Sequence, residues 1–455
     1  MTGKRTTSHE IERYTRLFSA RANSVKSSAM RDLMSITDRP EIISLAGGLP
    51  DTKSFPPALL ESVLVTLSRA VSAEALQYGP TEGLAGAKKC IVEVMAAENM
   101  KVDPDDLIVT TGGQQVIDLV TRSLIDPGDT IVAEAPTYPG AVPSFTSFQA
   151  NVVQIDVDAD GMRVEELEGT LDRLTAEGHP PKFIYTIPTF QNPSGVTMSL
   201  PRRKRLVAIA KERELLVLED NPYALLRYGG DPLPTLRSLD GGEFVMYLGT
   251  FSKILSPGLR LGWLEAPAPV LAKVNMAKQA ADLCTSSMTQ YLVSTYFEQA
   301  DWREYVATVT ELYRERRDVM LAALERYFPP EASWTRPEGG LFIWATLPDF
   351  IDTTDLLAKA LSENVAFVPG GAAYTDGRGR SSMRLNFSGV DESQIVEGIR
   401  RIGEIVTEQI SLYSTLTGKR GAPKAATAAD ESDAASADIV SLPERRKRDK
   451  EAREG

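Results

Sequence analysis

Short apolar runs alternate with amphipathic stretches between residues 105 and 265, and this alternation restricts the fold more than any other feature. Leu107–Thr110, Phe183–Ile187 and Leu215–Leu218 are compact apolar runs of the kind that form buried strands. Helical patterns separate them, as at Pro201–Glu212. Strands that alternate with helices predict a mostly parallel, doubly wound sheet with helices on both faces, and hence an α/β fold.

The predicted strands end in clusters of polar residues, glycine and proline. The clusters are Thr111–Gln115, Ala135–Pro139, Pro188–Gly195, Glu219–Tyr223 and Gly249–Leu261. In open parallel sheets, ligands bind outside the carboxyl ends of the strands. The sequence therefore predicts that these clusters form one shared site.

A smaller α+β domain is expected toward the C-terminus, where Gly339–Trp344 and Met383–Phe387 have strand patterns. We expect an N-terminal arm that joins this small domain over residues 1–75 and a large domain over 76–315. The small domain should cover 316–415, and the Ala- and Ser-rich, then basic, segment 416–455 predicts a disordered tail. Met276–Phe297 and Arg303–Tyr327 each predict one long helix.

Composition excludes several classes of function. The net charge of −12 argues against nucleic-acid and anionic-membrane partners. The only histidines are His9 and His179, so Ser-His-Asp hydrolysis and histidine-bound zinc lack their residues, and no metal is expected. Two cysteines, no signal peptide and no run of membrane-spanning length predict a soluble, cytoplasmic protein.

Lys253 follows the predicted strand Phe244–Leu248, with Thr250, Ser252 and Arg260 close in sequence. Burial and a neighbouring cation lower the pKa of a lysine, which favours the neutral amine that forms a Schiff base. The two hydroxyls and the arginine would suit a phosphate monoester. A solvated loop lysine would give the same local pattern, so the other strand ends decide between the two interpretations.

Those strand ends supply what a cofactor with a phosphate, a ring nitrogen, a phenolic oxygen and an aldehyde requires. A strand-to-helix turn offers backbone donors to a phosphate, an aromatic side chain can stack on the ring, and a buried carboxylate keeps the ring nitrogen protonated. Each residue also fits an ordinary turn, core or capping position. The candidates are Gly113 and Gln114 for the phosphate, Tyr138 for the ring, Asp220 for the nitrogen, and Asn192 and Tyr223 for the phenolic oxygen.

With these motifs the chain resembles the fold-type I, pyridoxal-phosphate-dependent aminotransferases of class I/II. It is most similar to the 2-aminoadipate (LysN-like) and kynurenine/aminoadipate group. The resemblance extends from about Ser28 to Phe387. Beyond the strand ends it includes Ile43–Pro50, Leu76–Gly83, Glu338–Trp344 and Asn364–Gly370.

The resemblance implies a role for each matching residue. Lys253 would hold the cofactor and shuttle a proton, Asp220 would pair with the ring nitrogen, Tyr138 would stack, and Asn192 and Tyr223 would bind the phenolic oxygen. The phosphate would lie against Gly113, Gln114, Thr250, Ser252 and Arg260. Gly113 stands where many relatives have serine, so one hydroxyl donor is lost.

The resemblance also implies how substrates bind and how chains assemble. Arg384 would clamp the substrate α-carboxylate beside Asn192, Gly47 and Gly48. The alternative is that Arg384 forms a structural salt bridge instead. Ser28 and Arg31 would meet a distal carboxylate, although Arg31 could instead be a surface residue paired with Asp32 or Glu41. Tyr78 would reach the phosphate in the other subunit, which implies a homodimer.

The expected activity is transamination between an L-amino acid and a 2-oxo acid such as 2-oxoglutarate, by a ping-pong reaction through the pyridoxamine form. The donor could be 2-aminoadipate, glutamate, an aromatic or a branched-chain amino acid. Two alternatives stay open from the sequence. One is another reaction on the same cofactor, such as C–S lysis or decarboxylation. The other is a non-catalytic effector-binding domain of the MocR type, which the acidic chain and the lack of a helix-turn-helix signal disfavour.

Overall fold

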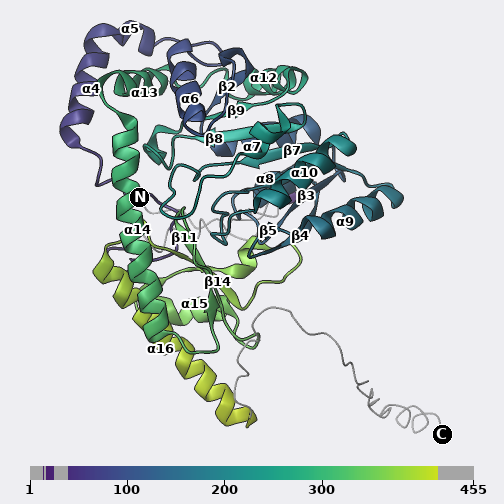
Figure 1. The fold of residues 1–455 in the computed structure, drawn as a ribbon, viewed down its shortest axis with the longest axis vertical. Helices are drawn as coiled ribbons and strands as arrows, with labels where there is room; N and C mark the ends of the chain where they lie inside the picture. The colour runs from purple at the N-terminus through teal and green to yellow at the C-terminus, as the bar shows by residue number, and fades with distance from the viewer. Residues whose placement is uncertain (1–13, 15–16, 25–38, 419–455) are drawn as a thin grey trace.

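The computed structural model describes residue 14, residues 17–24 and residues 39–418. Ser28, Arg31 and the predicted tail beyond residue 418 lie outside these ranges. The described chain forms a large sheet covered by helices and a smaller helix-packed sheet (Figure 1). The predicted fold class is confirmed, whereas the domain boundaries stay a prediction.

The large sheet has eight strands in the order β2-β9-β8-β7-β6-β3-β4-β5. Strands β8, β7, β6, β3 and β4 run parallel, and β9 is antiparallel to both of its neighbours. The strands are β2 (Leu107–Thr110), β3 (Thr130–Ala135), β4 (Asn151–Asp158), β5 (Gly161–Met162), β6 (Pro181–Thr186), β7 (Leu216–Asp220), β8 (Val245–Thr250) and β9 (Gly262–Glu265).

Both faces of this sheet are apolar, which is why its strands read as continuous apolar runs. Phe183 and Tyr185 of β6 belong to one buried cluster, whereas Ile184 between them belongs to the cluster on the other face. The covering helices are α6 (Ala85–Ala97), α7 (Gly113–Leu124), α8 (Val142–Ser147), α9 (Val164–Ala176), α10 (Leu200–Glu212), α11 (Leu236–Asp240), α12 (Ala268–Asp282) and α13 (Ser287–Gln299).

The prediction of a single helix over Met276–Phe297 is wrong. Helix α12 ends at Asp282, and Leu283 adopts a left-handed conformation with φ 65° that no helix can continue through. Ser286 then caps α13, because its side chain accepts a hydrogen bond from the backbone N–H of Thr289. The apolar pattern continues across the break because both helices bury one face.

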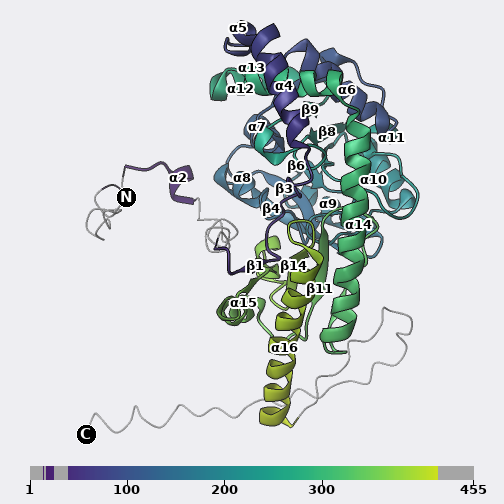
Figure 2. The ribbon, with the colours of Figure 1, turned by 90° about the vertical axis from the view of Figure 1, so that its left-hand side faces the viewer.

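The smaller sheet is antiparallel in the order β10-β11-β14-β13, and helix α14 runs alongside it from the large sheet, beside α16 (Figures 1 and 2). The elements are α14 (Trp302–Tyr327), β10 (Ser333–Trp334), β11 (Phe342–Thr346), α15 (Thr353–Ser362), β13 (Val368–Pro369), β14 (Ser382–Asn386) and α16 (Glu392–Thr417).

The N-terminal part of the described chain contacts both sheets. Strand β1 (Ile43–Ser44) pairs in parallel with β12 (Val365–Ala366), which ties it to the small-sheet region. Helices α4 (Pro57–Ala70) and α5 (Ser72–Ala75) pack against α13, and α2 (Ala20–Ser24) lies near α8. Among the described residues, no helix combines the length and apolar character needed to cross a membrane.

Candidate active site

A cavity of about 330 Å³ lies at the carboxyl ends of the central strands. Strands β8, β7, β6 and β3 are successive neighbours in the sheet, so the clusters that follow them meet at one edge, as predicted. The small sheet closes the cavity with Phe342 and Arg384. The predicted site residues that line it are Gly48, Gly113, Gln114, Tyr138, Asn192, Asp220, Tyr223, Thr250, Ser252, Lys253, Arg260 and Arg384.

Lys253 reaches into this cavity from the loop after β8, and its Nζ donates a hydrogen bond of 2.6 Å to the carbonyl oxygen of Gly48. The pKa of Lys253 is lowered to about 8, chiefly by burial. The Arg384 and Arg260 charges also lower it, whereas the Asp220 carboxylate raises it. A lysine with this pKa is partly neutral near pH 7, which a nucleophilic amine requires.

Asp220 is the last residue of β7, and its carboxylate is buried. The pKa of Asp220 is raised to about 7, mainly by burial and also by the nearby Glu134 carboxylate. A hydrogen bond from Tyr185 and the Lys253 charge oppose that rise. Tyr185 Oη donates to Asp220 Oδ2 over 2.6 Å. Sequence reasoning missed Tyr185, because a tyrosine inside an apolar strand is most often a core residue.

Arg384 is a buried arginine on β14, and it bridges the two sheets. Its Nη1 donates to Asn192 Oδ1 over 3.0 Å, and its Nη2 donates to the Ala46 carbonyl over 2.7 Å. The guanidinium lies 4.4 Å from the centre of the Phe342 ring. Burial lowers the pKa of Arg384 to about 10, so it is still charged at neutral pH.

Tyr223 lines the cavity together with Asn192 and Phe342. Asn192 Nδ2 donates to its hydroxyl over 3.4 Å, and the Tyr223 ring packs edge-on against Phe342. Tyr138 approaches from the β3 end, where a side chain on Gly140 would collide with its ring. The aromatic rings and the amide thus line the same cavity as Asp220 and Lys253.

A second group of lining residues has the chemistry of an anion site. Helix α7 begins at Gly113, so its free backbone N–H groups and the positive end of its dipole lie there. Gly112 has φ 79°, and a Cβ on it would come within 2.5 Å of Arg260 Nη2. Thr250 Oγ1 donates to Ser252 Oγ over 2.9 Å, which holds both hydroxyls together. The Gln114 side chain instead donates to Gly140 and Ser144, which leaves its backbone N–H as the donor for an anion.

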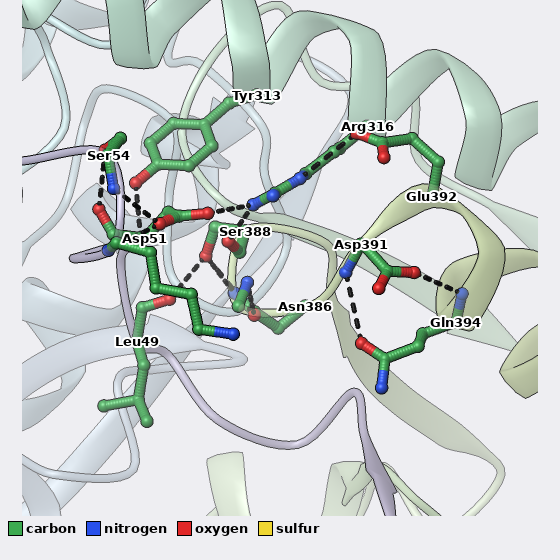
Figure 3. Close-up of polar contacts among 12 residues, drawn as sticks. Leu49, Asp51, Ser54, Tyr313, Arg316, Asn386, Ser388, Asp391, Glu392 and Gln394 are labelled. Atoms are coloured by element: carbon green, nitrogen blue, oxygen red, sulfur yellow. Dashed lines mark hydrogen bonds and ion pairs between the residues drawn. The ribbon is translucent and has the colours of Figure 1, made fainter.

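Backbone carbonyls of the segment after β1 accept hydrogen bonds from Lys253 and Arg384. Polar contacts of Leu49 and Asp51 hold this segment on the small-sheet side (Figure 3). Arg316 of α14 pairs with Asp51 over 2.9 Å and donates to the Ser388 carbonyl over 2.6 Å. Ser388 Oγ in turn donates to the Leu49 carbonyl over 2.7 Å. These contacts fix the backbone that presents the Ala46 and Gly48 carbonyls to the cavity.

Some predicted residues lie elsewhere. Tyr78 does not line this cavity, and its side chain is 78% exposed. Gly47 is next to the lining residue Gly48. Ser28 and Arg31 fall outside the described residues. Phe342 is a lining residue that the sequence predicted only as part of a strand, and the Gly339-Gly340 lead-in was the one signal near it.

The residues present fit pyridoxal 5′-phosphate. The cavity lining offers a helix N-terminus, two hydroxyls and an arginine, together with a carboxylate and a lysine. The cavity volume lies in the usual range for small-molecule sites. The donor set therefore matches a phosphate, a protonated ring nitrogen and an aldehyde.

Comparison with known proteins gives the family. The family described as aminotransferase class I and II matches residues 40–402. The aromatic-amino-acid aminotransferase 1 of Thermococcus litoralis is 42% identical over 87% of this chain and 95% of its own length.

Two solved structures agree with this match. The kynurenine aminotransferase of Pyrococcus horikoshii, solved with PMP, is 41% identical with a TM-score of 0.83, over 88% of this chain and 98% of that one. The α-aminoadipate aminotransferase LysN of Thermus thermophilus is 37% identical with a TM-score of 0.81, over 88% and 99%. The predicted resemblance is confirmed, and the chain belongs to the class I and II aminotransferases.

Proposed function

We propose that this aminotransferase moves the amino group of an L-amino acid to a 2-oxo acid in the cavity beside Lys253. The observation that carries the proposal is that Lys253, Asp220 and Arg384 face the same cavity. Together they provide an amine that can lose its proton, a carboxylate for a ring nitrogen, and a cation for the carboxylate that every substrate carries.

Pyridoxal 5′-phosphate is the cofactor of this enzyme. When bound, it supplies an aldehyde that condenses with amines and a ring that accepts electrons from the substrate α-carbon. In the proposed arrangement Asp220 pairs with the ring nitrogen, and Tyr138 packs on the ring. Asn192 and Tyr223 donate to the phenolic oxygen, and their existing contact supports that pairing.

The proposed place of the phosphate is the anion site at the start of α7. There it would accept hydrogen bonds from the backbone of Gly113 and Gln114 at the start of α7, and from Thr250, Ser252 and Arg260. The Thr250–Ser252 contact orients both hydroxyls before any ligand arrives. Since position 113 has no side chain, the backbone N–H is the donor there.

Lys253 is the proposed proton carrier. Its pKa of about 8 lets Nζ accept a proton from the substrate α-carbon at neutral pH and return it later. Arg384 binds the α-carboxylate, with Asn192 and the Gly47-Gly48 backbone beside it. Because amino and oxo acids share that carboxylate, one cavity serves both in turn, as a ping-pong reaction requires.

The proposed donors are 2-aminoadipate, glutamate, and aromatic or branched-chain amino acids, with 2-oxoglutarate as an acceptor. The names of the similar aminotransferases support this range, since they include aromatic amino acids, aminoadipate and kynurenine. Ser28 and Arg31 are the proposed contacts for a distal carboxylate. For apolar side chains Arg31 would swing away.

A homodimer is the proposed assembly, with Tyr78 of one subunit at the phosphate of the other. The exposed apolar residues Leu60, Leu64, Leu76 and Tyr78 on and after α4 support this, since such a patch marks an interaction surface. The proposed location is the cytoplasm, which the low cysteine content supports.

Half-reactions test the substrate range directly. The holoenzyme is mixed with one amino acid at a time, and the cofactor spectrum reports conversion to the amine form. We expect conversion by glutamate and 2-aminoadipate, and Arg31→Gln should impair these two far more than leucine or phenylalanine. Arg21→Gln, in the same N-terminal region, is the control. If only apolar donors convert, Arg31 has no role in the pocket.

Mixed dimers test the shared site. Tyr78→Ala and Lys253→Ala homodimers should each be impaired. Subunit exchange between them produces dimers in which one site has both native residues. We expect activity to return on mixing, and a failure to recover any activity would contradict the placement of Tyr78 at the partner's site.

A further inference from the structure

One buried hydroxyl beside the cavity has no role in the proposed reaction. Tyr185 is fully buried on β6 and does not line the cavity. Strand β6 lies between β3 and β7, and Tyr185 is in register with Ala133 of β3 and Leu218 of β7. From this position its hydroxyl reaches Asp220 Oδ2 over 2.6 Å. This distance is typical of a hydrogen bond to a charged oxygen.

Packing fixes the direction of this hydroxyl. The Tyr185 ring lies edge-on to Phe145 of α8, with centroids 5.4 Å apart and planes at 72°. The Phe145 ring also packs edge-on against Phe183, two residues earlier on β6. A tyrosine held this way has little rotamer freedom, so its hydroxyl stays directed at the Asp220 carboxylate.

Glu134 is a second buried carboxylate close to this pair, but it already has its own donors. Thr186 Oγ1, the Ile187 backbone N–H and Gln191 Nε2 donate to it over 2.6, 3.2 and 3.0 Å. Its charge disfavours ionisation of Asp220. The Tyr185 hydroxyl is thus the donor that the fold directs to Asp220.

The groups facing Asp220 act in opposite directions. Burial and Glu134 raise its pKa, whereas Tyr185 and the Lys253 charge lower it, and the result is about 7. Removal of the Tyr185 hydroxyl would leave the Asp220 carboxylate with one fewer hydrogen-bond donor. A hydrogen bond to a charged group changes an equilibrium constant by about 10- to 100-fold, which is about one to two pKa units.

We propose that Tyr185 is a positioning residue that keeps Asp220 ionised and directed at the ring nitrogen of the cofactor. Tyr185 itself touches neither cofactor nor substrate and acts only through Asp220. The inference rests on the proposed pairing of Asp220 with that nitrogen. It assigns to the buried strand β6 an influence, through Asp220, on the strength of cofactor binding.

The test uses the apoprotein and two probes, pyridoxamine 5′-phosphate and its 1-deaza analogue, which has a C–H in place of the ring nitrogen. Neither probe forms a covalent bond with Lys253. The variant is Tyr185→Phe, which keeps the ring and removes only the hydroxyl. The control is Tyr247→Phe, since Tyr247 is a buried tyrosine of the same sheet whose hydroxyl donates to a different carboxylate, Glu98.

We expect Tyr185→Phe to bind pyridoxamine 5′-phosphate about 5- to 50-fold more weakly at pH 7, because a carboxyl group with a higher pKa is ionised in fewer molecules. Affinity for the deaza analogue should not change. The pH below which affinity for pyridoxamine 5′-phosphate declines should lie about one to two units higher in the variant than in the wild type. The difference in affinity between the two proteins should become smaller toward a pH of about 9.5. Tyr247→Phe should match the wild type.

Two results would overturn the inference: an equal loss of affinity for both probes, which is the effect of damaged packing, or no loss for either. Asp220→Asn separates this from the proposed function. It should weaken binding of pyridoxamine 5′-phosphate and leave the deaza analogue unaffected. If Asp220→Asn does not discriminate between the probes, the pairing of Asp220 with the ring nitrogen is itself wrong.

Discussion

The ion pair between Arg316 and Asp51 offers the sharpest test of how the segment after β1 is held beside the cavity. Figure 3 shows this contact. The two side chains are only 9% and 11% exposed. Asp51→Asn is the change of choice, because Oδ1 of Asp51 accepts from the backbone N–H groups of Lys53 and Ser54, and an asparagine oxygen can do the same. At the Oδ2 position, however, an amide NH₂ would face the Arg316 guanidinium, donor against donor.

The expected cost follows from the partners that Arg316 keeps. Removing one member of a buried ion pair costs roughly 3–5 kcal/mol when the other charge is left alone. Arg316 would retain the Ser388 carbonyl at 2.6 Å and Glu392 at 3.4 Å. We therefore expect the free energy of unfolding to fall by about 2–3 kcal/mol.

Urea unfolding measures this as a lower midpoint with an unchanged m value. Glu325→Gln is the matched control, because Glu325 pairs with Arg336 where both side chains are more than half exposed. That pair should contribute less than about 1 kcal/mol. The Asp51→Asn effect should also survive high salt, since buried pairs are screened little. Equal shifts for the two variants, or a shift that salt abolishes, would refute the reasoning.

Three further predictions concern the reaction. Lys253→Ala should abolish turnover and the visible absorbance of the bound cofactor, and retained turnover would rule out Lys253 as the catalytic amine. Arg384→Ala should lower kcat/KM for every amino acid and oxo acid by about 30- to 1000-fold, because it removes a carboxylate contact of roughly 2–4 kcal/mol; a loss limited to one substrate would contradict that role. The rate of cofactor uptake by the apoprotein should rise with pH around a midpoint of about 8, where half of Lys253 is neutral, and level off by a pH of about 9.5; a rise that continues beyond a pH of about 10 would mean that its pKa is not lowered.

The arrangement of the strand ends could be predicted because parallel strands bring their carboxyl ends to one edge. Asp220 ends strand β7, Asn192, Tyr138 and Lys253 follow neighbouring strands, and all four line the cavity. Such placement needs only the strand order and the position of a residue after its strand. The predicted roles of these residues stay predictions until the variants are measured.

Contacts that depend on distant parts of the chain could not be predicted. The Gly48 carbonyl meets Lys253 because the segment after β1 folds back over the loop of β8, and nothing in either stretch encodes that contact. Tyr185 reaches Asp220 through the pairing register of β6 and β7. The break at Leu283 was missed because a left-handed leucine leaves no mark in an apolar pattern.

Burial lowers the pKa of both Arg384 and Lys253, but the two groups start from different values, and that difference separates their proposed roles. The pKa of Arg384 falls to about 10 and that of Lys253 to about 8. A guanidinium starts so high that it keeps its charge at neutral pH after this shift, so it can bind a carboxylate throughout the reaction. An amine starts lower, and the Arg384 charge pushes it lower still. The arginine that we propose as the substrate carboxylate's partner thus also lowers the pKa of the lysine, which would couple substrate binding and proton transfer within one cavity.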